Sequence, residues 1–106
     1  MSVNLTSREL LILGAVHFLG ETGYGTSIRS TIAEKTGQNL AFATLYTALD
    51  RLEKNNFIES RIAEPTAKRG GRRKKLYRIT GLGAERFDRA LDDLNCLRGK
   101  AIGATP

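Results

Sequence analysis

The chain has 106 residues, in which 17 lysines and arginines stand against 11 aspartates and glutamates, for a formal net charge of +6. At this length we expect one domain with a single core, and the positive charge favours a polyanionic partner, either nucleic acid or an anionic membrane surface. The single cysteine and single histidine exclude an internal disulfide, a Cys/His zinc site and a Cys/His catalytic pair, so we expect no metal or other cofactor.

The hydropathy of the chain disfavours a membrane role. No apolar run approaches the roughly 20 residues that a membrane-spanning helix needs. Met1 to Thr6 lacks the charged start and apolar stretch of a signal peptide. We expect a soluble cytoplasmic protein with no membrane partner.

The first predicted helix begins at a capping box formed by Thr6 and Glu9, whose side chains can satisfy free backbone donors. An apolar run from Leu10 to Leu19 follows and ends at Gly20. Apolar residues occupy nearly every side of this helix, so a single core-facing stripe cannot account for them all. We expect part of the helix to meet another subunit.

The second predicted helix follows a flexible turn at Gly23-Tyr24-Gly25. Ile28 and Ile32 recur at helical spacing, and Gly37 suits the left-handed position beyond a helix end. The turn could suggest a phosphate-binding loop, but neither the P-loop lysine nor the spacing of a dinucleotide fingerprint is present. We expect a turn, with DNA phosphate near the helix N-terminus as a minor contact.

The third predicted helix runs from about Leu40 to Asn55. Its inward stripe has spacings of three and four and consists of Phe42, Leu45, Leu49 and Leu52. A rotation of about 100 degrees per residue turns the other side outward, where side chains could enter a major groove. That side carries Ala43, Thr44, Thr47, Arg51 and Lys54, with Tyr46 at its border. Asp50 would meet DNA unfavourably, and a core helix with a solvated polar face explains this pattern equally well on its own.

A hairpin with a basic loop is predicted next. Asn56 can adopt the left-handed helix stop, after which 57–62 and 76–79 have the residues of two strands. Between them six cations and two glycines stand in eight consecutive residues: Lys68, Arg69, Gly70, Gly71, Arg72, Arg73, Lys74 and Lys75. Such a loop can lie along phosphates and place arginine in a narrow minor groove. The alternative is a solvated loop that only maintains solubility.

The last predicted helix is capped by Thr80, and its apolar residues repeat at three and four positions: Ala84, Phe87, Leu91, Leu94 and Leu97. Cys96 is expected to be a small buried residue and His17 a packing residue. The surplus apolar faces of the first and last helices predict a dimer interface made of Leu10, Leu13, Phe87, Leu91, Leu94 and Leu97. The small-residue tail should fray.

The element order predicts a mainly α fold with a small antiparallel β hairpin, a winged helix-turn-helix followed by a C-terminal dimerisation helix. We expect a winged-helix DNA-binding domain at 1–79, the dimerisation helix at 80–98 and a flexible tail at 99–106.

The third helix and the hairpin carry a family resemblance. Ala43 to Glu53 resembles the recognition-helix signature of PadR-type regulators, with the central Thr-Leu-Tyr and Arg-Leu-Glu as the main match, and Gly70 to Thr80 resembles their wing. The resemblance spans about Leu5 to Leu97 and implies a homodimeric winged helix, usually a repressor, whose first and last helices form the dimer. It implies that Thr44, Tyr46 and Thr47 face DNA and that Arg72, Arg73 and their neighbours supply the wing. Thr47, Asp50 and Asn55-Asn56 depart from the pattern.

We therefore expect a sequence-specific transcriptional regulator, a repressor that binds an inverted-repeat operator in double-stranded DNA as a homodimer. The alternatives are a sequence-independent architectural protein that binds nucleic acid, and a winged-helix protein-interaction module. An enzyme is not expected, because no paired carboxylates, activated nucleophile or metal cluster stands at a supporting spacing. A small-molecule effector, unidentified, is a possible further partner, with room only for a modest pocket lined by Phe18, Tyr24 and Phe87.

Overall fold

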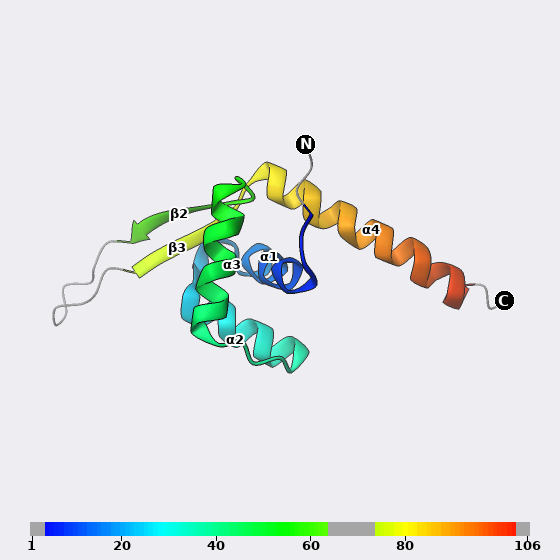
Figure 1. The fold of residues 1–106 in the computed structure, drawn as a ribbon, viewed down its shortest axis with the longest axis horizontal. Coiled ribbons are helices and arrows are strands. Elements are labelled where there is room, and N and C mark those ends of the chain that lie inside the picture. Colours follow the sequence, from blue (N-terminus) through cyan, green and yellow to red (C-terminus); the bar gives the residue numbers. More distant parts are fainter. Residues whose placement is uncertain (1–3, 64–73, 104–106) are drawn as a thin grey trace.

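The computed structural model describes residues 4–63 and 74–103, which form four helices and a small three-stranded antiparallel sheet (Figure 1). In chain order the elements are α1 (Ser7–Leu19), a 3₁₀ turn (Gly20–Thr22), β1 (Gly23–Tyr24), α2 (Gly25–Thr36), α3 (Phe42–Lys54), β2 (Ile58–Ala63), β3 (Lys74–Ile79) and α4 (Gly81–Gly103). This arrangement confirms the predicted class. Within these two ranges, none of the helices is long and apolar enough to span a membrane.

The predicted helix boundaries have the expected chemistry. The backbone N–H of Glu9 donates to the Thr6 hydroxyl at 3.1 Å, and the Thr6 N–H donates to the Glu9 carboxylate at 2.9 Å, which completes the capping box of α1. Gly37 ends α2 with a left-handed φ of 78°, and Asn56 turns the chain after α3 with a φ of 65°. The Thr80 hydroxyl accepts from the Gly83 N–H at 2.9 Å at the start of α4.

The expected turn at Gly23-Tyr24-Gly25 is wrong in part, because its first two residues form β1. The strand order is β1-β3-β2, with Gly23 opposite Tyr77 and Tyr24 opposite Leu76. A Cβ on Gly23 would lie 2.8 Å from the carbonyl oxygen of Tyr77, so the close approach of the strands needs glycine. A two-residue strand that contains glycine shows no alternation, and the sequence therefore gave no strand signal.

The core lies where α1, α2, α3 and the sheet meet. The largest side chains in it are fully or almost fully buried: Ile12, Leu13, Val16, Ile28, Leu45, Leu49, Leu52, Phe57 and Ile58. The inward stripe of α3 differs from the prediction, because Phe42 is 43% exposed and Ala48 takes part in the core instead. Phe42 is the first residue of α3, where the helix has not yet reached the core.

α4 extends away from this core, on the side opposite the β2–β3 hairpin (Figure 1). Its helix continues to Gly103, past the predicted end at Arg98. The base of α4 contacts α1: the His17 ring meets the Phe87 ring edge-on, with centroids 6.0 Å apart, although His17 itself is exposed rather than packed in the core. Further along, the helix projects beyond the core. Cys96 is therefore exposed rather than buried, because nothing in the described chain lies over it.

Candidate nucleic-acid interface

The outer face of α3 is the first part of the candidate interface. Ala43, Thr47, Asp50 and Lys54 are exposed along it at spacings of three and four, so they form one row. The Thr47 hydroxyl donates to the carbonyl oxygen of Ala43 at 2.9 Å, which leaves its methyl group and its oxygen lone pairs on the surface. Thr44 is half-buried at the margin of this row. Ala43, Thr47 and Lys54 are exposed on the side that the helical period predicted, and Asp50 lies among them.

Tyr46 lies at the other margin of the row, in a fixed position. Its ring stacks near that of Phe42, with centroids 6.2 Å apart and an angle of 20° between the planes. A Cβ added to Gly25 would overlap the Tyr46 hydroxyl, so this hydroxyl lies directly against the first residue of α2. Tyr46 thus packs the first turns of α3 against the start of α2.

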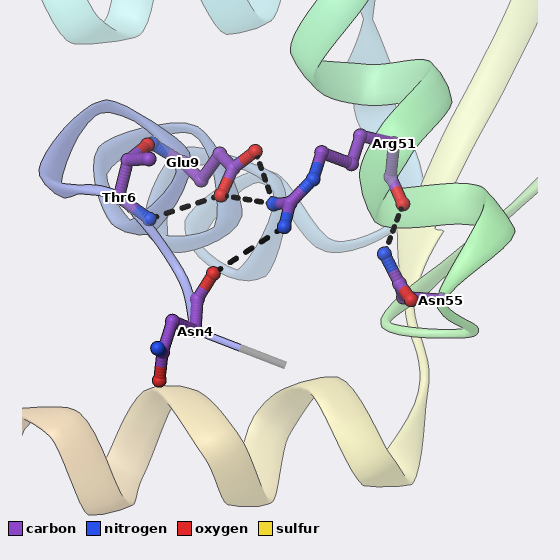
Figure 2. Close-up of polar contacts among 5 residues, drawn as sticks. All are labelled: Asn4, Thr6, Glu9, Arg51 and Asn55. Atoms are coloured by element: carbon purple, nitrogen blue, oxygen red, sulfur yellow. Dashed lines mark hydrogen bonds and ion pairs between the residues drawn. The ribbon is translucent and has the colours of Figure 1, made fainter. Parts of the chain in front are cut away.

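Arg51, which helical rotation predicts for the DNA-facing side, is 44% exposed, but its guanidinium is bound within the chain. Its Nη1 donates to both carboxylate oxygens of Glu9 at 2.6 Å, and its Nη2 reaches the carbonyl oxygen of Asn4 at 3.5 Å (Figure 2). Glu9 is only 6% exposed and also accepts from the Thr6 backbone, so Arg51 neutralises a buried charge on α1. The pair was missed because its members are far apart in sequence.

A second set of polar contacts holds the same end of α3. Glu53 accepts a hydrogen bond of 2.6 Å from the Ser60 hydroxyl on β2, and its other oxygen lies 3.9 Å from the Lys75 Nζ on β3. Arg51 and Glu53 thus fix α3 to α1 on one side and to the hairpin on the other. These two residues therefore fix the position of the polar row.

The hairpin is the second part of the candidate interface. β2 and β3 pair in register from Ile58 opposite Ile79 to Ala63 opposite Lys74, and they lead to the basic loop. Six of the predicted wing residues lie outside the described residues: Lys68, Arg69, Gly70, Gly71, Arg72 and Arg73. Of the other two, Lys74 lies at the open end of β3, and the Lys75 ammonium lies 5.8 Å from the centroid of the Tyr77 ring.

One cation of the sheet, Arg78, is paired within the chain. Arg78 donates to Glu59 at 2.6 and 3.1 Å and lies 3.5 Å from Glu21, and the hydrogen bond to Glu59 raises the pKa of the guanidinium. Burial raises the pKa of Tyr77 to about 12, so its hydroxyl is neutral at physiological pH. In the described part of the chain, no three His, Cys, Asp or Glu side chains are placed to hold a metal ion.

A separate apolar groove of about 830 Å³ lies between α1, α2 and α4. Its apolar lining includes Leu10, Leu11, Phe18, Phe87, Leu91 and Leu94. Three residues predicted for the dimer interface are exposed here or beyond it, namely Leu91, Leu94 and Leu97, and Leu10 is half-buried. Leu13 is a correction, because it is fully buried in the core of its own chain and offers no surface to a partner. Tyr24 does not line this groove.

Three helices with an antiparallel hairpin that leads to a basic loop define a winged helix-turn-helix protein, in which α2 and α3 form the helix-turn-helix. The family described as "Transcriptional regulator PadR-like family" matches residues 12–89. The chain therefore belongs to the PadR-like family of transcriptional regulators, and family and fold are those of regulators rather than enzymes. No curated protein matches the chain in sequence.

Solved structures of similar proteins agree with this assignment. A PadR family regulator from Clostridium difficile has a TM-score of 0.75 at 23% identity, with 92% of this chain and 97% of that chain covered. A transcriptional regulator from Clostridium thermocellum has a TM-score of 0.70 at 31% identity, with 92% and 90% covered. Bacillus subtilis PadR, in complex with operator DNA, has a TM-score of 0.69 at 26% identity, with 81% of this chain covered. This chain spans 47% of that protein.

Proposed function

We propose that this regulator is a repressor that binds an inverted-repeat operator in double-stranded DNA as a homodimer. The observation that carries the proposal is the exposed polar row of α3 beside a hairpin that leads to a run of cations. Operator DNA bound to the similar Bacillus subtilis PadR supports DNA as the partner. A regulator of this kind represses by occupying DNA that polymerase needs.

In the proposed complex α3 enters the major groove. Ala43, Thr44 and Thr47 offer small apolar groups and hydroxyl oxygens to base edges, and the Tyr46 hydroxyl binds phosphate. Phosphate next to Tyr46 also lies near the N-terminus of α2, where free backbone N–H groups attract anions. Asp50 on the same row would repel phosphate, and this restricts the orientation of α3 in the groove.

The wing, the basic loop of the hairpin, supplies the second set of DNA contacts in this proposal. Lys68 to Lys75 would follow the backbone next to the major-groove site and place arginine in the minor groove, where negative potential is concentrated. These contacts add affinity for every duplex, whereas α3 selects among sequences.

The homodimer in this proposal uses the apolar groove and the exposed side of α4. Residues 1–79 then form the DNA-binding part and α4 the dimerisation helix, with an interface of Leu10, Phe87, Leu91, Leu94 and Leu97. Two-fold symmetry places the two α3 helices in successive major grooves, about 34 Å apart. A small molecule that prefers one arrangement of the two protomers would regulate DNA binding from the same groove.

The wing is tested with two variants of equal net charge. Arg72→Ala with Arg73→Ala removes two cations from the loop, and Arg8→Ala with Arg89→Ala removes two exposed cations that do not line the apolar groove. We expect only the wing variant to reduce the slope of log affinity against log salt, by about 0.9 per lost phosphate contact. Fluorescence anisotropy with a labelled duplex measures this slope. Equal slopes for the two variants would show that the wing does not bind phosphate.

A further inference from the structure

The ring of Phe42 is an exposed apolar group at the start of α3. It is 43% exposed at the first position of the helix, next to Ala43 in the polar row. Exposed aromatic rings cost free energy in water, and single ones need no explanation on an arbitrary surface. This ring, however, lies at the end of α3 where a recognition helix approaches base edges.

The ring is held in place by its neighbours. The guanidinium carbon of Arg29 lies 4.6 Å from its centroid, and the Arg29 Nε donates to the carbonyl oxygen of Leu40 at 2.5 Å. The Tyr46 ring lies nearly parallel to the Phe42 ring, with the two centroids 6.2 Å apart. A side chain that is both exposed and fixed loses little entropy when it binds, which is the property of a preorganised contact.

We propose that Phe42 is a specificity-determining residue that contacts the 5-methyl group of thymine in the major groove, with Arg29 and Tyr46 as positioning residues. The inference rests on the proposed function, because α3 must enter that groove. The thymine methyl is the apolar group that a base pair presents there, and aromatic side chains recognise it by apolar contact. Ala43 and Thr47 offer only single methyl groups for such a contact, and Phe42 and Tyr46 are the large apolar side chains exposed on the described residues of α3.

Two other roles for Phe42 make different predictions. A ring that only covers the link between α2 and α3 affects the stability of the protein and binding to every duplex alike. A ring that wedges between base steps kinks the duplex, and its contribution does not depend on a methyl group. Only a contact with the thymine methyl makes the effect of a Phe42 substitution depend on the methyl groups of individual thymines.

The experiment first selects a preferred duplex from a random pool with the wild-type protein. Each thymine in that duplex is then replaced by deoxyuridine, which removes one methyl group at a time. We expect one or two positions in each half-site at which wild-type affinity falls about fourfold, the fold-change equivalent to burial of one methyl group. Phe42→Ala should bind the parent duplex about tenfold more weakly and should be insensitive to those replacements.

Two more variants complete the test. Phe42→Leu keeps an apolar side chain and should retain part of the methyl dependence. Leu82→Ala removes an exposed apolar side chain at the start of α4, far in sequence from Phe42, and should behave as the wild type. Thermal unfolding of Phe42→Ala should match the wild type, because an exposed ring contributes little to the core.

The outcomes separate this inference from the proposed function. Wild-type enrichment of a sequence, with Phe42→Ala equally sensitive to every methyl group, would overturn the role of Phe42 and leave the regulator proposal in place. Loss of affinity in Phe42→Ala without coupling to any thymine would also overturn it. Failure of the wild-type protein to enrich any sequence would overturn both.

Discussion

The side chain of Glu9 is a buried carboxylate whose charge is compensated by groups from two segments. Arg51 donates to both of its oxygens, and the Thr6 N–H donates to one of them. Glu9 is 6% exposed, whereas the Arg51 side chain is 44% exposed. If Glu9 is removed, water can solvate the exposed Arg51 guanidinium. If Arg51 is removed, water cannot solvate the buried Glu9 carboxylate as well.

This difference predicts unequal costs for two single substitutions. Arg51→Met leaves a carboxylate without its cation in the interior and should lower the free energy of unfolding by about 3 kcal/mol. Glu9→Gln leaves a guanidinium that can turn to water and should cost about 1 kcal/mol. Urea unfolding followed by circular dichroism measures both, and Arg78→Met, which breaks an exposed pair, serves as the control with little change expected. A larger cost for Glu9→Gln than for Arg51→Met would contradict this account.

Helical periodicity predicted the direction of most side chains on α3 but not their partners. Ala43 and Thr47 face outward and Leu45, Leu49 and Leu52 inward, as the period requires. Arg51 also leaves the helix on the outer side, yet its guanidinium bends to Glu9 on another helix. Phe42 lies on the predicted apolar stripe but beyond the edge of the core. The Glu9 partner of Arg51 and the exposure of Phe42 depend on contacts between elements, which a period within one element does not contain.

At the scale of elements, the start of α4 depends on a close contact with the sheet. The Thr80 N–H donates to the carbonyl oxygen of Phe57 at 3.0 Å, and its hydroxyl donates to that of Asn56 at 2.7 Å. A Cβ added to Gly83 would overlap the same Phe57 carbonyl oxygen. Glycine at this position lets α4 begin directly against the end of α3 and the start of β2.

Two glycines of α4 give a matched test of that contact. Alanine normally stabilises a helix relative to glycine by about 1 kcal/mol. Gly83→Ala should instead destabilise the protein by about 1–3 kcal/mol, because backbone must move to relieve the overlap. A Cβ on Gly81 meets nothing within 4 Å, so Gly81→Ala should not destabilise it. Chemical denaturation compares the two, and equal stability of the variants would exclude the tight junction.

The elements that have strong local signals were predicted from the sequence. The capping box at Thr6, the left-handed positions at Gly37 and Asn56, and the cap at Thr80 are each short-range features, and each is present. β1 was not predicted, because its existence depends on pairing with β3 rather than on its own two residues. The sequence predicted the end of α4 too early, because the small residues after Arg98 have weak helix propensity but do not terminate the helix.

At the scale of the whole molecule, α4 presents apolar side chains that its own protomer does not cover. Leu94 is 57% exposed and lines the groove, whereas Leu82 is 45% exposed at the base of the same helix. The sequence predicted the apolar face of α4 and a modest pocket at Phe18 and Phe87, but not the extent of the groove, since this depends on how three helices approach one another. Two exposed leucines on one helix allow the proposed dimer to be tested.

Leu94→Lys should convert the proposed dimer to a monomer, because the interface would bury an unpaired charge. Leu82→Lys should leave the dimer intact, as it lies outside the groove. Sedimentation equilibrium over a range of protein concentrations measures both. Neither substitution touches the core, so both variants should fold. A dimer that survives Leu94→Lys with unchanged affinity would place the interface elsewhere.

The most direct test of the account is binding of the full chain to the duplex it enriches from a random pool, compared with a scrambled duplex of equal length and composition. The comparison is made across a series of salt concentrations, because phosphate contacts alone give affinity that falls steeply with salt. A regulator that reads its operator should prefer the enriched duplex by about a thousandfold or more at physiological salt. Equal affinity for the two duplexes at every salt concentration would contradict sequence-specific regulation and would indicate an architectural DNA-binding protein instead.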